Sequence, residues 1–132
     1  MKELLKELQK LHLPQDQYAI YGSGPMAIRK IRPAKDLDVI VTDNLFQKLK
    51  QNYSWEKKLG KYSGRIKLGR IEIYPASAWE PQVYGLANYI KRAESIDRFK
   101  FVRLDDLIKC KKMMGGEKHL SDIKLIKKYL KS

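Results

Sequence analysis

The stretch YGSGPMAIRKIRPAKDLDVIV, residues 21–41, holds a glycine-serine turn followed by an apolar run that contains two aspartates. The run DLDVIV has the character of a strand, so Asp36 and Asp38 share one face while Leu37 and Val39 share the other. Two carboxylates on one face repel each other at neutral pH. The pair therefore calls for a counter-charge, which a lysine or a divalent cation such as Mg²⁺ can supply.

A third carboxylate occurs in a second strand-like run, GRIEIYP. Ile71 and Ile73 face one way and Glu72 faces the other. If this strand lies beside DLDVIV, three carboxylates converge, which is the ligand set of a two-metal phosphoryl-transfer site. The alternative interpretation makes Glu72 an ordinary exposed residue of a half-buried strand, and Asp36 and Asp38 charges that face solvent.

The glycine-serine turn lies between an expected strand, YAIY, and an expected short helix that begins near Pro25. Gly22 lets the backbone approach a phosphate closely, and N–H groups at a helix start favour an anion. The Ser23 hydroxyl can donate to a phosphate oxygen, and Arg29 can add a charge-assisted contact. Arg29 can equally be a plain surface arginine.

The order of these features resembles the signature of the DNA polymerase β-like nucleotidyltransferase superfamily. A hydrophobic residue precedes Gly22 and Ser23, 12 residues (24–35) follow, then come the Asp-x-Asp strand at 36–39 and a later acidic strand at 71–73. The resemblance implies that Asp36 and Asp38 bind two Mg²⁺ ions and that Glu72, where the family often has aspartate, binds the catalytic one. It implies that the nucleotide contacts Gly22, Ser23, Arg29 and Lys118.

The C-terminal part resembles the helical end of small members of the same superfamily. In the run LDDLIKCKKMMGGEKHLSDIKLI, Lys118 matches a residue that contacts a nucleotide phosphate, and Asp122 one that orients this lysine. His119 stands where these members usually have an acidic residue. The resemblance covers residues 18–74 well and residues 99–126 loosely.

The function implied is transfer of a nucleoside monophosphate from an NTP to an acceptor hydroxyl, with release of pyrophosphate. Two alternatives remain open: a nucleotide- or RNA-binding module of the same fold without activity, and a partner subunit of a toxin–antitoxin pair. The acceptor is expected to be RNA, with tRNA as the leading candidate from the resemblance; a small molecule such as an antibiotic is the alternative acceptor.

The charge balance favours a polyanionic partner. The 132 residues include 28 Lys and Arg against 15 Asp and Glu, a formal net charge of +13, which attracts nucleic acid. Lysines concentrate at 57–67 and 109–131, where they are expected to border the site. They can also simply keep lysine-rich faces solvated.

The length, the cysteine content and the apolar runs of the chain limit the class of protein further. The length predicts one domain, and the single cysteine, Cys110, cannot form an internal disulfide, which favours the cytoplasm. No apolar run approaches the ~20 residues of a membrane span, so no membrane partner is expected. The oligomeric state is open, and a homodimer is compatible with the short chain.

The predicted fold is α/β (α+β): a nucleotidyltransferase fold with a short mixed sheet flanked by helices, as one domain (1–132) with a core at 18–80 and a helical part at 83–132. Strands are expected at 18–21 and 36–41, in 54–59 and 64–75, and within 97–104. Helices are expected at 3–12, 25–31, 43–49, 83–91 and 104–114, and from 117 onward. The last helix is expected to bury Leu120, Ile123, Ile126 and Leu130 and to expose Lys124, Lys127, Lys128 and Lys131.

Overall fold

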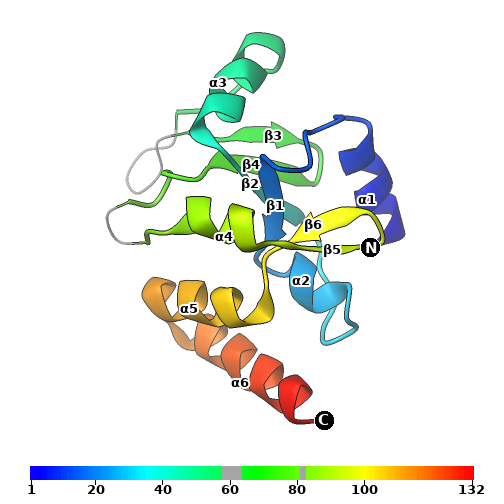
Figure 1. Ribbon diagram of the computed structural model, residues 1–132, viewed down its shortest axis with the longest axis vertical. Coiled ribbons are helices and arrows are strands. Elements are labelled where there is room, and N and C mark those ends of the chain that lie inside the picture. The colour runs from blue at the N-terminus through cyan, green and yellow to red at the C-terminus, as the bar shows by residue number, and fades with distance from the viewer. Residues whose placement is uncertain (58–63, 81–82) are drawn as a thin grey trace.

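A computed structural model describes residues 1–57, 64–80 and 83–132. These residues form a mixed open sheet of six strands with six helices around it (Figure 1), so the predicted mixed α/β class is confirmed. The strands are β1 (Tyr18–Tyr21), β2 (Leu37–Val41), β3 (Ile66–Leu68), β4 (Ile71–Pro75), β5 (Glu94–Ile96) and β6 (Phe99–Phe101). The helices are α1 (Lys2–Gln9), α2 (Gly24–Ala27), α3 (Asp43–Asn52), α4 (Leu86–Arg92), α5 (Leu104–Met114) and α6 (Glu117–Lys131).

The sheet has the order β3-β4-β2-β1-β6-β5, so β1, which ends at Tyr21, and β2 lie at its centre. β2 runs antiparallel to β1 and parallel to β4, and β1 runs parallel to β6. The strand expected in 54–59 is reduced to one bridge, between Glu56 and Arg65; residues 58 and 59 lie outside the described part. β5 was not predicted, and it lies within residues 83–132, which were expected to be mainly helical.

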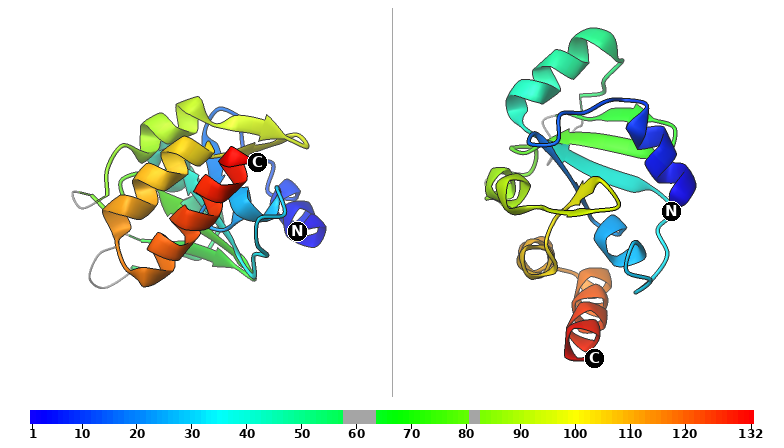
Figure 2. Two further views of the ribbon diagram at one scale, coloured as in Figure 1. Left: turned by 90° about the horizontal axis from the view of Figure 1, so that it is seen from below. Right: turned by 45° about the vertical axis from the view of Figure 1, so that its right-hand side comes forward.

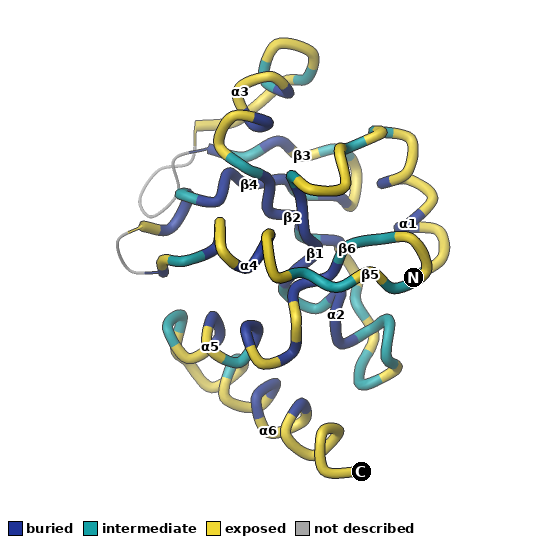
Figure 3. The backbone as a smooth tube through the Cα atoms, viewed as in Figure 1, coloured by how far each residue is buried: buried dark blue, intermediate teal, exposed yellow. Residues whose placement is uncertain are grey.

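Alternation along the central strands creates a hydrophobic core on each face of the sheet. Leu37 and Val39 join the side chains of α1 and α3 in one core. Ile40 and Tyr74 join the side chains of α4 and α5 in the other core, which also includes Ile126 of α6. Figure 3 shows that burial concentrates in the strands and in the inward faces of the helices. The second core is the one that adjoins the candidate site.

α5 and α6 form an antiparallel pair at the end of the molecule away from α3 (Figure 1 and Figure 2). Gly115 and Gly116, both at positive φ, separate the two helices, as the sequence predicts. The expected burial of two α6 leucines is wrong: Leu120 is 55% and Leu130 54% exposed, whereas Ile123 and Ile126 are buried. α6 has 15 residues and α5 has 11, so part of α6 extends past its neighbour.

Local features of the chain explain where α3 begins and where α2 ends. The Thr42 hydroxyl oxygen accepts a hydrogen bond from the Leu45 N–H, which caps α3 at its first turn. α2 is a single turn of four residues and ends well before the expected residue 31. Lys30 adopts a left-handed conformation with φ of +61°, which is incompatible with a continued helix.

Candidate active site

Asp38 and Glu72 lie side by side on one face of the sheet, near its centre. They are register partners on the adjacent parallel strands β2 and β4, so their side chains leave the same face. Each lies between buried apolar neighbours that enter the opposite core, Leu37 and Val39 for the one and Ile71 and Ile73 for the other. Strand pairing therefore brings together two of the three carboxylates that the sequence singles out.

Asp36 lies one residue before β2, in a bend, and is exposed. It is close enough to Asp38 for their charges to interact, because repulsion from Asp36 helps to raise the pKa of Asp38. The structure thus brings all three acidic residues to one region, although the predicted strand at 36–41 begins one residue later than expected. In the described parts of the chain, no three or more His, Cys, Asp or Glu side chains are grouped closely enough to hold a metal ion as they stand.

Asp38 is the carboxylate most perturbed by its surroundings. Burial, followed by repulsion from Glu72 and Asp36, raises its pKa to about 6, and the nearby Lys111 and Lys118 oppose this increase only in part. A carboxylate in this situation gains from any further positive charge placed next to it. A divalent cation with oxygen ligands would meet that need.

Glu72 has counter-charge and hydrogen bonds from its own chain. Its Oε1 accepts a hydrogen bond from Arg65 Nη1 at 2.7 Å and another from the Tyr74 hydroxyl at 2.7 Å. Arg65 also donates from Nε to Glu56 Oε1 at 3.0 Å, so its guanidinium bridges two glutamates. Burial, followed by the hydrogen bond to Glu72, raises the pKa of Tyr74, which keeps its hydroxyl protonated as a donor.

The glycine turn brings backbone directly against Asp38. Gly22 has φ of +68°, and a Cβ atom at this position would lie 2.8 Å from Asp38 Oδ2. Gly24 is similarly confined, since a Cβ there would lie 2.3 Å from Ile20 Cγ2. Ser23 is the N-cap residue of α2 and makes no side-chain capping bond. Only glycine gives position 22 both the required backbone conformation and the space beside the carboxylate.

Arg29 bonds to groups other than these carboxylates. Its guanidinium pairs with Glu94 of β5 and donates to the Pro25 carbonyl at 2.8 Å. These bonds fasten the segment after the glycine turn to the edge of the sheet. Arg29 does not line the cavity described next.

A cavity of about 320 Å³ opens between the sheet and the α5–α6 pair, with Gly22 and Asp38 in its wall. One side is aromatic: the Trp79 ring centroid lies 5.4 Å from that of Tyr21 and 4.8 Å from that of Tyr74. The remaining wall is formed by residues of α5, of α6 and of the segments next to α4 and α5, namely Val83, Leu107, Cys110, Lys111, Met113, Met114, Gly115 and His119. An apolar cavity with a few polar groups at its edge is the usual form of a small-molecule site.

A buried ionic network supports the wall of the cavity. Asp122 accepts from Lys111 Nζ at 2.9 Å and from Arg32 Nε and Nη2 at 2.8 Å each. Lys111 is 3% and Asp122 4% exposed. Burial opposes ionisation of Asp122, but the bonds from Arg32 and Lys111 outweigh it and lower its pKa to about 2. The network therefore fixes an ammonium group at the cavity wall, near Asp38.

Lys111 and Arg32 were not predicted from the sequence as residues of this region. Asp122 bonds to them, and no hydrogen bond or ion pair joins it to Lys118 in the described residues. One signal was present: Lys111 follows Leu107 by four residues on the apolar face of α5, where a lysine is unexpected. Lys118 itself is exposed at the start of α6 and acts on Asp38 through its charge.

His119 contributes the remaining polar group of the cavity wall. Its Nδ1 atom is buried and has no hydrogen-bond partner among the described residues. Burial, then the positive charge of Lys111, lowers the pKa of this imidazole, so it is neutral at physiological pH. A neutral imidazole here can donate or accept a hydrogen bond from a ligand.

Comparison with known proteins yields no relative: no family model, no curated protein and no solved structure matches the chain. The chemistry of the region therefore rests on its own geometry. Three acidic residues, a glycine turn and a partly aromatic cavity adjoin one another. Such a combination suits a ligand with a flat apolar part in the cavity and an anionic part that meets the carboxylates only through a bound cation.

Proposed function

We propose that the chain is a metal-dependent nucleotidyltransferase, which moves a nucleoside monophosphate from an NTP to an acceptor hydroxyl and releases pyrophosphate. One observation carries the proposal: Asp38 and Glu72 are register partners on adjacent strands, beside the Gly22 turn and a cavity. The resemblance of residues 18–74 to the polymerase β-like superfamily supports the same assignment.

In this proposal Asp36 and Asp38 hold two Mg²⁺ ions and Glu72 holds the catalytic one. The donor set fits, because carboxylate oxygens are the ligands Mg²⁺ prefers. Burial and repulsion from Glu72 and Asp36 raise the pKa of Asp38, and a cation beside it would offset both. When bound, the ions would neutralise charge on the phosphates and make the acceptor hydroxyl a better nucleophile. The remaining tasks fall to groups of the chain itself.

The cavity accounts for the rest of the nucleotide. The base would lie against the aromatic side at Trp79 and Tyr74, with His119 Nδ1 as a hydrogen-bond partner for its polar edge. The phosphates would then extend toward Gly22 and Asp38, which share the same wall. The buried Lys111 adds positive charge at this wall. Binding would thus place the phosphates beside the acidic residues.

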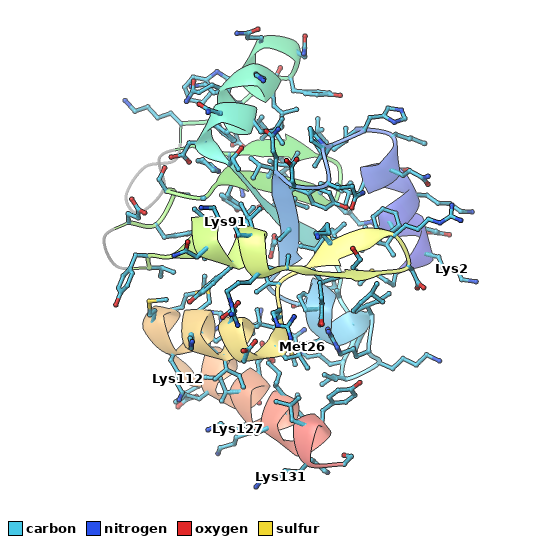
Figure 4. All side chains as sticks on the ribbon, viewed as in Figure 1. Lys2, Met26, Lys91, Lys112, Lys127 and Lys131 are labelled. Carbon is cyan, nitrogen blue, oxygen red and sulfur yellow. The ribbon has the colours of Figure 1, made fainter. Side chains whose placement is uncertain are left out.

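RNA is the acceptor that the charge distribution favours, with tRNA as the first candidate. Figure 4 shows Lys127 and Lys131 of α6 pointing away from the body of the molecule, together with Lys112 of α5. These side chains offer positive charge to a phosphate backbone at the end of the molecule that α5 and α6 form. The other expected group of lysines, 57–67, includes residues 58–63, which lie outside the described part. A small hydroxylated molecule such as an antibiotic is the alternative acceptor.

The bonds of Glu72 favour a second candidate function. Because Arg65 and Tyr74 already satisfy one oxygen of Glu72, the chain could bind a nucleotide or RNA at the same place without transferring it. A partner subunit in a toxin–antitoxin pair would be one form of such a module. Both candidates predict nucleotide binding, and only the first predicts turnover.

Purified protein incubated with each labelled NTP, Mg²⁺ and a panel of acceptors tests the proposal. The panel includes tRNA, short RNA oligonucleotides, hydroxylated small molecules and the protein itself. Transfer of label with release of pyrophosphate is expected for the wild type and for Asp16→Asn, an exposed aspartate outside the site. Asp38→Asn should be inactive. NTP binding without transfer to any acceptor would support the non-catalytic module instead.

A further inference from the structure

We propose that Arg65 and Tyr74 are positioning residues that fix Glu72 for the binding of a cation. The inference rests on the proposed function, because it assigns a role toward the same cation site. Both donors bond to Oε1 of Glu72, at 2.7 Å each. A carboxylate oxygen has two lone pairs, so Oε1 is fully used and the second oxygen, Oε2, is the one left for a ligand.

The need for such a clamp follows from the length of glutamate. Glu72 has one more rotatable bond than an aspartate would have at this position, so its carboxylate can take up more positions. Ligands of a metal site are usually oriented by hydrogen bonds to their outer atoms. The guanidinium of Arg65 and the hydroxyl of Tyr74 form two such bonds, and they do so from different strand positions, next to β3 and on β4.

Arg65 is itself held in place. Its Nε donates to Glu56 Oε1 at 3.0 Å, and the backbones of Arg65 and Glu56 form a bridge with two N–H to O bonds of 2.9 and 2.8 Å. The side chain is 18% exposed and that of Glu72 is 16% exposed, so the pair is partly withdrawn from water. An arginine fixed on one side by Glu56 can hold Glu72 on the other without being drawn out into solvent.

Lys67 provides a matched control for the charge of Arg65. It is the register partner of Glu72 on β3, so both side chains lie on the same face of the sheet. In the described part of the chain it forms no ion pair with Glu72. Lys67→Gln therefore removes one positive charge near Glu72 without removing a bond to it.

Binding of Mn²⁺, measured by electron paramagnetic resonance in the presence of a non-hydrolysable NTP analogue, tests the inference. Arg65→Gln should weaken the binding of one Mn²⁺ about tenfold, in the range that loss of an orienting bond produces. Tyr74→Phe should also weaken it, Arg65→Lys should restore part of the affinity, and Lys67→Gln should not weaken it. Thermal melting of each variant checks that it is folded, and Tyr74→Phe carries the test if Arg65→Gln is not.

The outcomes separate the inference from the proposed function. If Asp38→Asn loses Mn²⁺ binding but Arg65→Gln and Tyr74→Phe bind as the wild type does, the clamp is refuted and the cation site stands. Tighter binding in Arg65→Gln would also refute the clamp, because Arg65 would then be a competitor of the cation for Glu72. If Asp38→Asn binds Mn²⁺ as the wild type does, the proposed function itself fails.

Discussion

Gly22 and Asp38 approach each other so closely that a Cβ atom at residue 22 would lie 2.8 Å from Oδ2 of the carboxylate. Gly22→Ala should therefore destabilise the fold by more than the ~1 kcal/mol that a positive φ alone costs an alanine. Gly69→Ala is the matched control, since Gly69 has φ of +62° and open space around it. Chemical denaturation of both variants measures the difference. Equal losses would show that the contact with Asp38 has no energetic weight.

The raised pKa of Asp38 predicts a pH-dependent stability in the absence of divalent cations. Burial and repulsion raise the folded-state pKa to about 6 from 3.8, so between these values the folded chain holds a proton that the unfolded chain has lost. Stability should fall as pH rises through this window. Asp38→Asn should then be more stable than wild type by about 1 to 2 kcal/mol near neutral pH, with no difference below about pH 4.

Urea unfolding in the presence of a chelator, at several pH values across that window, measures this dependence. Asp16→Asn, at an exposed position, should follow the wild type. A wild type more stable than Asp38→Asn near neutral pH would show that the carboxylate is already compensated by its own chain.

The Lys111–Asp122–Arg32 network predicts unequal effects of removing its members. Asp122→Ala leaves the buried Lys111 ammonium without its partner and should destabilise the fold by about 3 kcal/mol or more. Lys111→Met should cost clearly less, because Asp122 keeps both bonds from Arg32. Denaturant unfolding ranks the two variants. The reverse order would place the main stabilisation in the lysine rather than in the carboxylate.

Acid should weaken the same network. Because the pKa of Asp122 is lowered to about 2 from 3.8 in the folded chain, its contribution is present above about pH 4 and is lost as pH falls toward 2. Comparing wild type with Asp122→Asn over this range isolates the contribution. A constant difference between the two proteins would contradict the assignment.

Trp79 should report occupation of the cavity. Its ring lies in the cavity wall at a tilt of 41° to that of Tyr74, whereas Trp55 lies outside the cavity and is 43% exposed. In Trp55→Phe, fluorescence arises from Trp79 alone, and an NTP with Mg²⁺ should change its intensity with saturation. Removing Trp79 instead, in Trp79→Phe, should leave a signal that does not respond. A response that persists from Trp55 would place the base elsewhere.

The lysines of α6 predict a salt-dependent reaction with RNA. Each RNA phosphate that the protein neutralises adds roughly 0.7 to the slope of log affinity against log salt. Replacing Lys124, Lys127, Lys128 and Lys131 by glutamine should reduce that slope and the rate on RNA, and leave NTP affinity unchanged. A salt-insensitive reaction, or efficient transfer only to a small hydroxylated molecule, would refute the RNA acceptor while leaving transferase activity possible.

Local patterns predicted the central elements of the fold. The short apolar run YAIY predicted the strand at Tyr18–Tyr21, and the run DLDVIV predicted, within one residue, the strand at Leu37–Val41. Paired glycines predicted the break between α5 and α6. β5 was not predicted, because Glu94–Ile96 is a short edge strand without an apolar pattern. Periodicity shows which face of a helix is apolar but not how far its neighbour extends, which is why Leu130, near the end of α6, was wrongly expected to be buried. The exposure of Leu120, in the first turn of α6, has no such explanation.

The candidate site was only partly visible in the sequence, because its contacts join distant segments. The alternation of Glu72 with two isoleucines predicted that its side chain leaves the face of the strand opposite to theirs. Its register with Asp38 could be read only from the pairing of β2 with β4 in the structure. Arg32, between α2 and β2, Lys111 of α5 and Asp122 of α6 come from three separate segments, and no spacing rule connects them. The same holds for the Arg65 bond to Glu72, which depends on the pairing of β3 with β4.

The parallel pairing of β1 with β6 also bears on how the molecule assembles. Ile20 is the register partner of Phe101, so the two ends of this contact are separated by most of the chain. Contacts of such long sequence separation form slowly, since a large loop must close first. α5 and α6, which follow β6 directly, can take their places over the sheet only after that closure. The cavity between the sheet and these helices therefore exists only after α5 and α6 have packed against it, so a ligand that fills the cavity would bind after this late step of folding.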